Sequence, residues 1–256
     1  MNLKINESWI EIKMKQLPAI TAMMILSSAF GQDTEKQNTS TEFKRLLIGV
    51  NISPDIGYRT LKNNDGSSTS ATIIYLRNNN EKPKFGYNAG LNVCYYYSTH
   101  FGIEAGIQYS NNGYTFKTTD LVYGDGIDQR YGFVYDTTIG GPIKAKFLYN
   151  HIYLDIPLRA IFIFGERRIR FITSIGVTTN IFLNATQTGI LEYKNGNTVR
   201  QTAEQQYDFN PLDVSPTLSV GVVYKVNSRM NLQVEPMFGY GLLQIIDAQI
   251  KIYLWS

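Results

Sequence analysis

The chain has 256 residues, a formal net charge of +3 and one cysteine, which excludes an intramolecular disulfide framework, a multi-cysteine metal site and a strongly basic nucleic-acid binder. Hydrophobic residues make up 43% of the chain and charged residues only 18%, yet the mean hydropathy is -0.18. Apolar and uncharged polar residues must therefore be interleaved. This excludes a bundle of membrane-spanning helices, each of which needs about 18 consecutive apolar residues.

The first 31 residues have the three parts of a secretory signal peptide. Basic Lys13 and Lys15 precede an apolar stretch, 17–30, that is too short to span a bilayer, and small residues follow at Ala29 and Gly31. The sequence therefore predicts export, with residues 1–31 as the signal peptide and Met14 as the hypothetical natural start. Residues 32–43 are then expected to form a periplasmic segment before a domain that covers 44–256.

Beyond residue 44 the apolar residues recur with a period of two, which is the pattern of a β-strand with two different faces. Within 148–164, for example, Leu154, Ile156 and Leu158 alternate with Tyr153, Asp155 and Arg159. The same alternation predicts eight strands, at 46–52, 85–97, 101–110, 148–164, 169–184, 212–226, 230–242 and 248–255.

The connections between these strands alternate between long and short. The three long ones are polar and cover 60–82, 111–145 and 185–210. Tight turns at one end and long loops at the other are typical of barrels in the outer membrane. The sequence therefore predicts an all-β protein: an eight-stranded, antiparallel, up-and-down transmembrane β-barrel with periplasmic termini.

Alternation alone does not say which face points outward, because a soluble barrel would bury its apolar face and a membrane barrel exposes it. The glycines fall on the polar face, where a narrow lumen requires small residues between large ones. The apolar face carries aromatic residues near the strand ends, such as Tyr95 and Tyr97, as an interfacial girdle does. Both features favour the membrane barrel.

The polar face also carries charged residues, and an eight-stranded barrel has no room for a wide pore around them. We therefore expect a structural network of ion pairs in the lumen, with a narrow polar conduit as the alternative. The predicted network consists of Glu104, Asp155, Arg159, Arg170, Lys225, Glu235 and Lys251.

No residue pattern indicates catalysis or a cofactor. His100 falls in a short turn and His151 on the polar face, and neither has a serine or carboxylate at a recognisable catalytic spacing. Cys94 is expected to be a small interior residue. The spacing of acidic residues within 119–130 does not match a regular calcium loop, so we predict no catalytic, cofactor or metal residues.

Four segments, 47–53, 101–113, 153–158 and 218–224, resemble the outer-membrane β-barrel domain family that is widespread in Bacteroidetes and includes the PorT-like proteins. The resemblance extends over about residues 44–256 and rests on strand patterns. It implies an outer-membrane location, no known enzyme activity, and recognition of the C-terminal strand by the insertion machinery. Such barrels usually end on an aromatic residue, whereas here Ser256 follows Trp255.

These observations predict a non-enzymatic protein of the outer membrane with a filled polar lumen and long surface loops. Its expected role is in envelope integrity, adhesion or binding of a protein partner through the loops, with membrane lipid around the barrel and no nucleic acid. One alternative is an accessory component of a secretion machinery, as in the PorT-like proteins. Another is an outer-membrane enzyme that modifies lipids or cleaves proteins.

Overall fold

The structure is a computed structural model, and it describes the backbone of residues 21–28 and all atoms of 45–119, 141–227 and 230–256. These residues form strands almost throughout. The elements are β1 (Thr21–Ser28), β2 (Leu46–Asn63), α2 (Ser68–Asn80), β3 (Glu81–Tyr96), β4 (Phe101–Thr119), β5 (Pro142–Phe164), β6 (Ile169–Tyr193), β7 (Thr198–Glu204), β8 (Leu212–Lys225), β9 (Met230–Gly239) and β10 (Ile250–Trp255).

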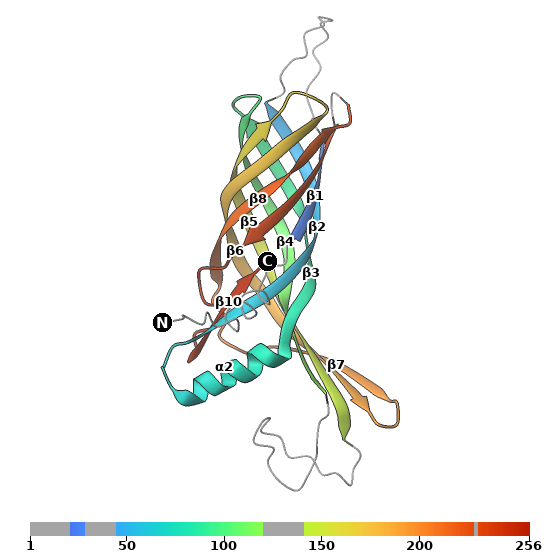
Figure 1. Cartoon of the computed structure of the whole chain (residues 1–256), viewed down its shortest axis with the longest axis vertical. Helices are drawn as coiled ribbons and strands as arrows, with labels where there is room; N and C mark the ends of the chain where they lie inside the picture. The colour runs from blue at the N-terminus through green and yellow to red at the C-terminus, as the bar shows by residue number, and fades with distance from the viewer. Residues whose placement is uncertain (1–20, 29–44, 120–140, 228–229) are drawn as a thin grey trace, which may run out of the picture.

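The strands form one antiparallel sheet in which chain neighbours pair with each other. Its order is β1-β9-β8-β6-β5-β4-β3-β2-β10, and β7 pairs with β6 outside this path. The sheet curves into an elongated, barrel-shaped wall (Figure 1). Among the described residues, no helix is both long and apolar enough to cross a membrane. The predicted all-β meander is therefore confirmed.

The prediction of eight strands is wrong, because the position between β9 and β2 is shared by two short strands. Toward one end, β10 pairs with β2 over Tyr58–Asn63, and the isolated bridge of Tyr240 to Trp255 joins it to the end of β9. Backbone hydrogen bonds between Gly239 and Ser256, and from Gly241 N to Leu254 O, belong to the same contact. Toward the other end, β1 pairs with both β2 and β9. The strand β1 falls within the stretch predicted as the signal peptide, 1–31.

Side-chain exposure shows which face of the wall points outward. Val50, Leu91 and Phe171 are exposed, whereas Asn51 and Asn92, their neighbours of opposite parity, are buried. The apolar face therefore lies on the outside and the polar face lines the lumen. This is the arrangement of a membrane barrel, and it confirms the orientation that the glycine and aromatic positions predict.

Where the structure describes them, the three predicted long loops are largely strand and helix. In the first, residues 60–63 complete β2 and the helix α2 follows. In the second, residues 111–119 extend β4 and residues 142–145 belong to β5. In the third, residues 185–193 extend β6, which forms a hairpin with β7. Period-two strands thus continue well beyond the apolar part of the wall. Asp120, Asp125 and Asp128 lie outside the described residues.

Two interior glycines allow neighbouring strands to approach each other closely. A Cβ atom on Gly176 would lie 2.3 Å from the backbone oxygen of Leu158 and 2.7 Å from Arg159 Cγ. A Cβ atom on Gly221 would lie 2.2 Å from the backbone oxygen of Val234 and 3.0 Å from Glu235 Cβ. Each glycine therefore leaves space beside a large charged side chain of the lumen.

We predict that Gly221→Ala destabilises the barrel by about 1–3 kcal/mol, because the added methyl group would overlap backbone that cannot rotate away. The measurement is urea unfolding of the protein in detergent micelles, followed by loss of heat-modifiable gel mobility. Gly239→Ala is the matched control, since its Cβ atom would be 3.5 Å from the nearest atom. Equal stability of the two variants would contradict the packing argument.

Candidate functional site

The centre of the lumen holds an ion cluster made by Glu104 of β4, Arg159 of β5 and Glu235 of β9, which we call the inner ion cluster. Arg159 Nε donates to Glu104 Oε1 at 3.1 Å, and a second, short bond from Nη2 to the same oxygen makes the pair tightly coupled. Arg159 Nη1 lies 3.6 Å from Glu235 Oε1. All three side chains are almost completely buried.

Uncharged side chains complete the hydrogen bonding of the two carboxylates. Asn92 Nδ2 donates to Glu104 Oε2 at 2.8 Å, and Ser174 Oγ donates to Glu235 Oε1 at 3.0 Å. Ser219 and Gln233 each donate a further, short bond to Glu235. Buried charges are tolerated only when they are paired and hydrogen-bonded, and this shell meets that condition.

The other four residues of the predicted network do not join this cluster. Asp155 is buried and accepts a hydrogen bond of 2.8 Å from Asn180 Nδ2. Arg170 and Lys251 are partly exposed and Lys225 is exposed. Within the part of the chain that the structure describes, none of these three cations lies in an ion pair. The structure thus brings together Glu104, Arg159 and Glu235 and leaves the remaining four residues apart.

A small polar cavity of ≈ 60 Å³ lies next to the inner ion cluster. Its lining includes the carboxylates of Asp55, Asp155 and Asp213, with amides and hydroxyls between them. A cavity of this size holds about two water molecules. No group of three or more acidic, histidine or cysteine side chains suited to a metal ion occurs among the described residues.

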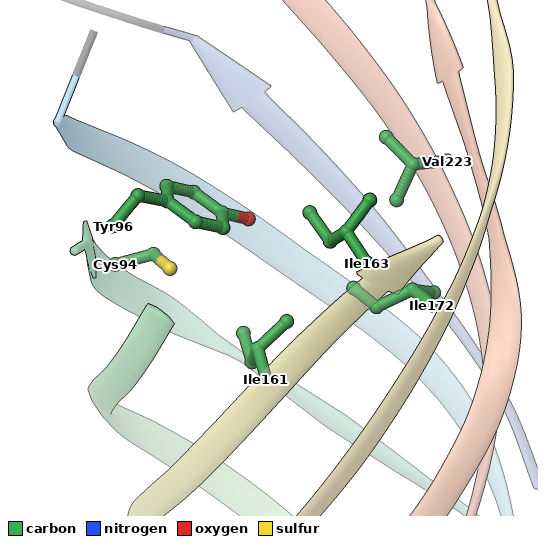
Figure 2. Close-up of a cluster of buried hydrophobic side chains, with 6 residues drawn as sticks. All are labelled: Cys94, Tyr96, Ile161, Ile163, Ile172 and Val223. Atoms are coloured by element: carbon green, nitrogen blue, oxygen red, sulfur yellow. The ribbon is translucent and has the colours of Figure 1, made fainter. Parts of the chain in front are cut away.

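Two apolar clusters lie on either side of the polar centre. At the end with the short turns, the side chains of the inner apolar cluster are buried inside the barrel (Figure 2). It consists of Cys94, Tyr96, Ile161, Ile163, Ile172 and Val223. In the other half of the barrel, the outer aromatic cluster combines Tyr114 and Tyr153 with apolar residues from β10 and the segment before it, Ile245, Ile252 and Leu254. Buried apolar and aromatic side chains therefore lie on both sides of the cavity.

His151 and Cys94 are buried among aromatic and apolar side chains, and His100 lies in an exposed turn. His151 is 1% exposed, packs against the rings of Tyr114 and Phe209, and leaves Nδ1 without a hydrogen-bond partner. His100 is in the exposed turn before β4, where its Nδ1 is 2.9 Å from Thr99 Oγ1. Cys94 is buried in the inner apolar cluster, where the sequence predicted a small interior residue.

At the outer end of the barrel, an ionic contact attaches α2 to the wall; we call it the rim cluster. Glu81 accepts a hydrogen bond from Arg77 of the helix at 2.6 Å and a short bond from Arg59 of β2. Arg77 also donates to the hydroxyl of Tyr114 at 3.1 Å, and Arg59 Nη1 donates to Asn78 at 2.6 Å. Burial lowers the pKa of Arg77, but Tyr114 and Glu81 outweigh it and hold that pKa above its ordinary value.

Sequence reasoning missed two groups of interior residues. Ile161, Ile163 and Ile172 have the parity of the polar face, so they point into the lumen although they are apolar. The signal was present in the sequence, as apolar residues on both parities close to a tight turn. Arg59 and Glu81 were missed because Arg59 directly precedes, and Glu81 falls within, the range 60–82, whose composition is that of a polar loop.

The family comparison agrees with this geometry. Residues 30–247 match the model of a family described as outer membrane protein beta-barrel domain. The chain belongs to this family. Its members are barrels of the outer membrane, and the exposed apolar wall with a polar lumen is what that location requires of this chain.

Two solved structures are similar to the chain at low sequence identity. A major outer membrane protein from Thermus thermophilus has 13% identity and a TM-score of 0.40, with 86% of this chain and 100% of that chain covered. The attachment invasion locus protein Ail of Yersinia pestis has 10% identity and a TM-score of 0.26, with 93% of this chain and 95% of that chain covered. A search of curated proteins gave no match.

We predict that Arg159→Met destabilises the barrel by about 3–5 kcal/mol, because two buried carboxylates would lose their counter-ion. Urea unfolding in detergent micelles measures the loss. Lys144→Met is the control, since Lys144 pairs with Glu192 at 3.3 Å on the exposed surface, where an ion pair contributes at most about 1 kcal/mol. An Arg159 variant as stable as this control would show that the inner ion cluster is not stabilising.

A second prediction concerns the attachment of α2. Glu81→Gln removes the charge that both arginines share, so we expect the helix to separate from the rim while the barrel stays folded. Limited proteolysis should then cut within 64–80 at least about tenfold faster, since local opening controls cleavage. Glu192→Gln is the exposed control. Unchanged cleavage would mean that α2 is held by other contacts.

Proposed function

We propose that this outer-membrane barrel is a non-enzymatic surface protein that acts in envelope integrity, adhesion or partner binding through the outward extensions of its strands. The observation that carries the proposal is the length of β4, β5 and β6, which continue past the exposed apolar wall and end in hairpins and loops. The extension β7 is exposed at every residue. A protein surface of this kind, held on a rigid wall, is suited to contact molecules outside the cell.

The filled lumen supports a role at the surface rather than in transport. The inner apolar cluster and the outer aromatic cluster lie on either side of a cavity of ≈ 60 Å³. Within the proposed lumen network of seven charged residues, Glu104, Arg159 and Glu235 would hold the wall strands together.

Export is part of the same proposal. Residues 1–31 would serve as the signal peptide, with Met14 as the natural start, and 32–43 as a periplasmic segment; the family match begins at residue 30, close to the expected cleavage site. Cleavage there would remove β1, so the exported chain would lack the short strand that pairs with β2 and β9. Insertion would then rely on recognition of β10, the C-terminal strand, by the insertion machinery, and lipid would contact the apolar wall.

A second candidate is an accessory role in protein secretion, as in the PorT-like proteins of Bacteroidetes. Its support is the resemblance of segments 101–113 and 153–158, which the structure places in the paired strands β4 and β5. Their inward residues, such as Glu104 and Asp155, face the lumen, and their outward residues, such as Ile107 and Leu158, are exposed on the wall. A secretion defect after gene deletion, restored by the intact gene, would favour this candidate.

The leading proposal predicts that the protein fractionates with outer membranes, shows heat-modifiable gel mobility, and loses its surface binding when residues 190–201 are replaced by a short turn. This change removes the tip of the β6–β7 hairpin and leaves the apolar wall intact. The measurement is adhesion of cells to host or abiotic surfaces. Shortening the inner turn at 226–229 is the matched control.

Two results would contradict the proposal. A soluble periplasmic product would overturn the location, and unchanged adhesion in the hairpin variant, with normal membrane insertion, would overturn the role of the outward extensions.

A further inference from the structure

An open groove of ≈ 480 Å³ lies on the wall where β8 begins and β10 follows the bend after β9. Leucine side chains form much of its lining, and Tyr253 and Lys251 of β10 complete one side. Leu212, Leu242 and Leu243 are 43%, 54% and 42% exposed. The groove is therefore an apolar surface that the described part of the protein leaves uncovered.

The groove continues the lipid-facing surface of the barrel. Leu212 pairs with Ile181 of β6, and both belong to the parity that points outward along the wall. Further along β8, the outward residues Leu218 and Val220 are 56% and 63% exposed. An apolar ligand in the groove would thus lie beside the hydrocarbon chains that surround the barrel.

Aromatic rings mark the level of the groove in the membrane. Trp255 contacts Tyr58 edge to face with 5.5 Å between ring centroids, and Tyr240 stacks on Tyr253 at 6.4 Å. Amphipathic aromatic side chains gather at the boundary between hydrocarbon and headgroups. The groove therefore lies at the outer boundary of the hydrocarbon layer.

Two lysines lie directly opposite each other just outward of these rings. Lys62 of β2 is the register partner of Lys251 of β10, and Lys62 Nζ is 4.8 Å from the ring centroid of Tyr253. Like charges in opposite positions of a sheet destabilise each other. Neither lysine lies in an ion pair with any residue of the described chain, so the pair is an uncompensated positive site at the edge of the groove.

The combination selects one class of ligand. A free phosphate ion would use the two ammonium groups and leave the leucine surface uncovered, whereas an uncharged lipid would cover the leucines and leave the ammonium groups without an anion. An anionic lipid with a phosphate in its headgroup satisfies both, because a net negative headgroup attracts lysines near a membrane surface and acyl chains cover apolar area.

We propose that this groove binds an anionic phospholipid or phosphorylated glycolipid of the surrounding leaflet, with an acyl chain against Leu212, Leu242 and Leu243 and a headgroup phosphate between Lys62 and Lys251. The site fixes one lipid in a defined place on the wall. It lies on β10 beside β2, next to the short contact that joins β10 to the end of β9.

The test is native mass spectrometry of the full chain in detergent micelles with an equimolar mixture of phosphatidylglycerol and phosphatidylcholine that carry the same acyl chains. We expect the protein to retain phosphatidylglycerol about tenfold more than phosphatidylcholine, from the attraction of two lysines for one headgroup. The double variant K62Q/K251Q should lose this preference. The control K144Q/K225Q removes two exposed lysines elsewhere and should keep it.

Two further measurements distinguish binding of the whole lipid from binding of its phosphate group or its acyl chain alone. An excess of inorganic phosphate should not displace the bound lipid, and Leu243→Ser should lower the retention of both lipids alike. The proposal is overturned if K62Q/K251Q keeps the preference, if inorganic phosphate displaces the lipid, or if Leu243→Ser changes neither lipid. Outer-membrane fractionation of each variant confirms that the barrel itself is unaffected.

Discussion

The pairing of backbone polar groups is the constraint from which the rest of this structure follows. A chain surrounded by hydrocarbon cannot leave its N–H and C=O groups exposed, so it must pair them within the wall. Every described strand of the wall has neighbours in the antiparallel sheet, including the position where two short strands, β1 and β10, share the place between β9 and β2. The pairing of strands thus takes precedence over a regular count of strands.

The period of two then sets the chemistry of both faces. Outward positions contact lipid and are apolar, so polar residues can occur only on the inward positions, where they must satisfy one another in a narrow space. The inner ion cluster meets this requirement with one arginine, two glutamates and a shell of amides and hydroxyls. Gly176 and Gly221 provide the space beside Arg159 and Glu235. Beyond the hydrocarbon layer, outward positions need not be apolar, and there the strands extend into hairpins. The rim cluster holds α2 on the wall at this end.

Local pattern in the sequence was sufficient for the barrel class and for the direction of the faces along most of the wall. The exception is β10, where Ile252 and Leu254 are buried and Lys251 lies on the outer face. The alternation around Leu154, Asp155 and Leu158 shows a two-faced strand, and the glycines on the polar parity show which face is enclosed. These properties depend on neighbours within one strand. The structure of the long connections could not be predicted in the same way, because the strand extensions at 111–119 and 185–193 are too polar to show which face would be buried.

The amino-acid sequence by itself determined the strands, their two faces and the candidate charges of the lumen. Only the tertiary structure decided which of the seven charges meet, because the register between β4, β5 and β9 brings Glu104, Arg159 and Glu235 together and leaves Lys225 and Lys251 apart. It also decided that Ile161 and Ile172 fill the lumen, and that Lys62 faces Lys251 across two strands that are distant in the chain. Register and closure depend on contacts between residues far apart in the sequence, and the periodicity of a single strand contains no information about them.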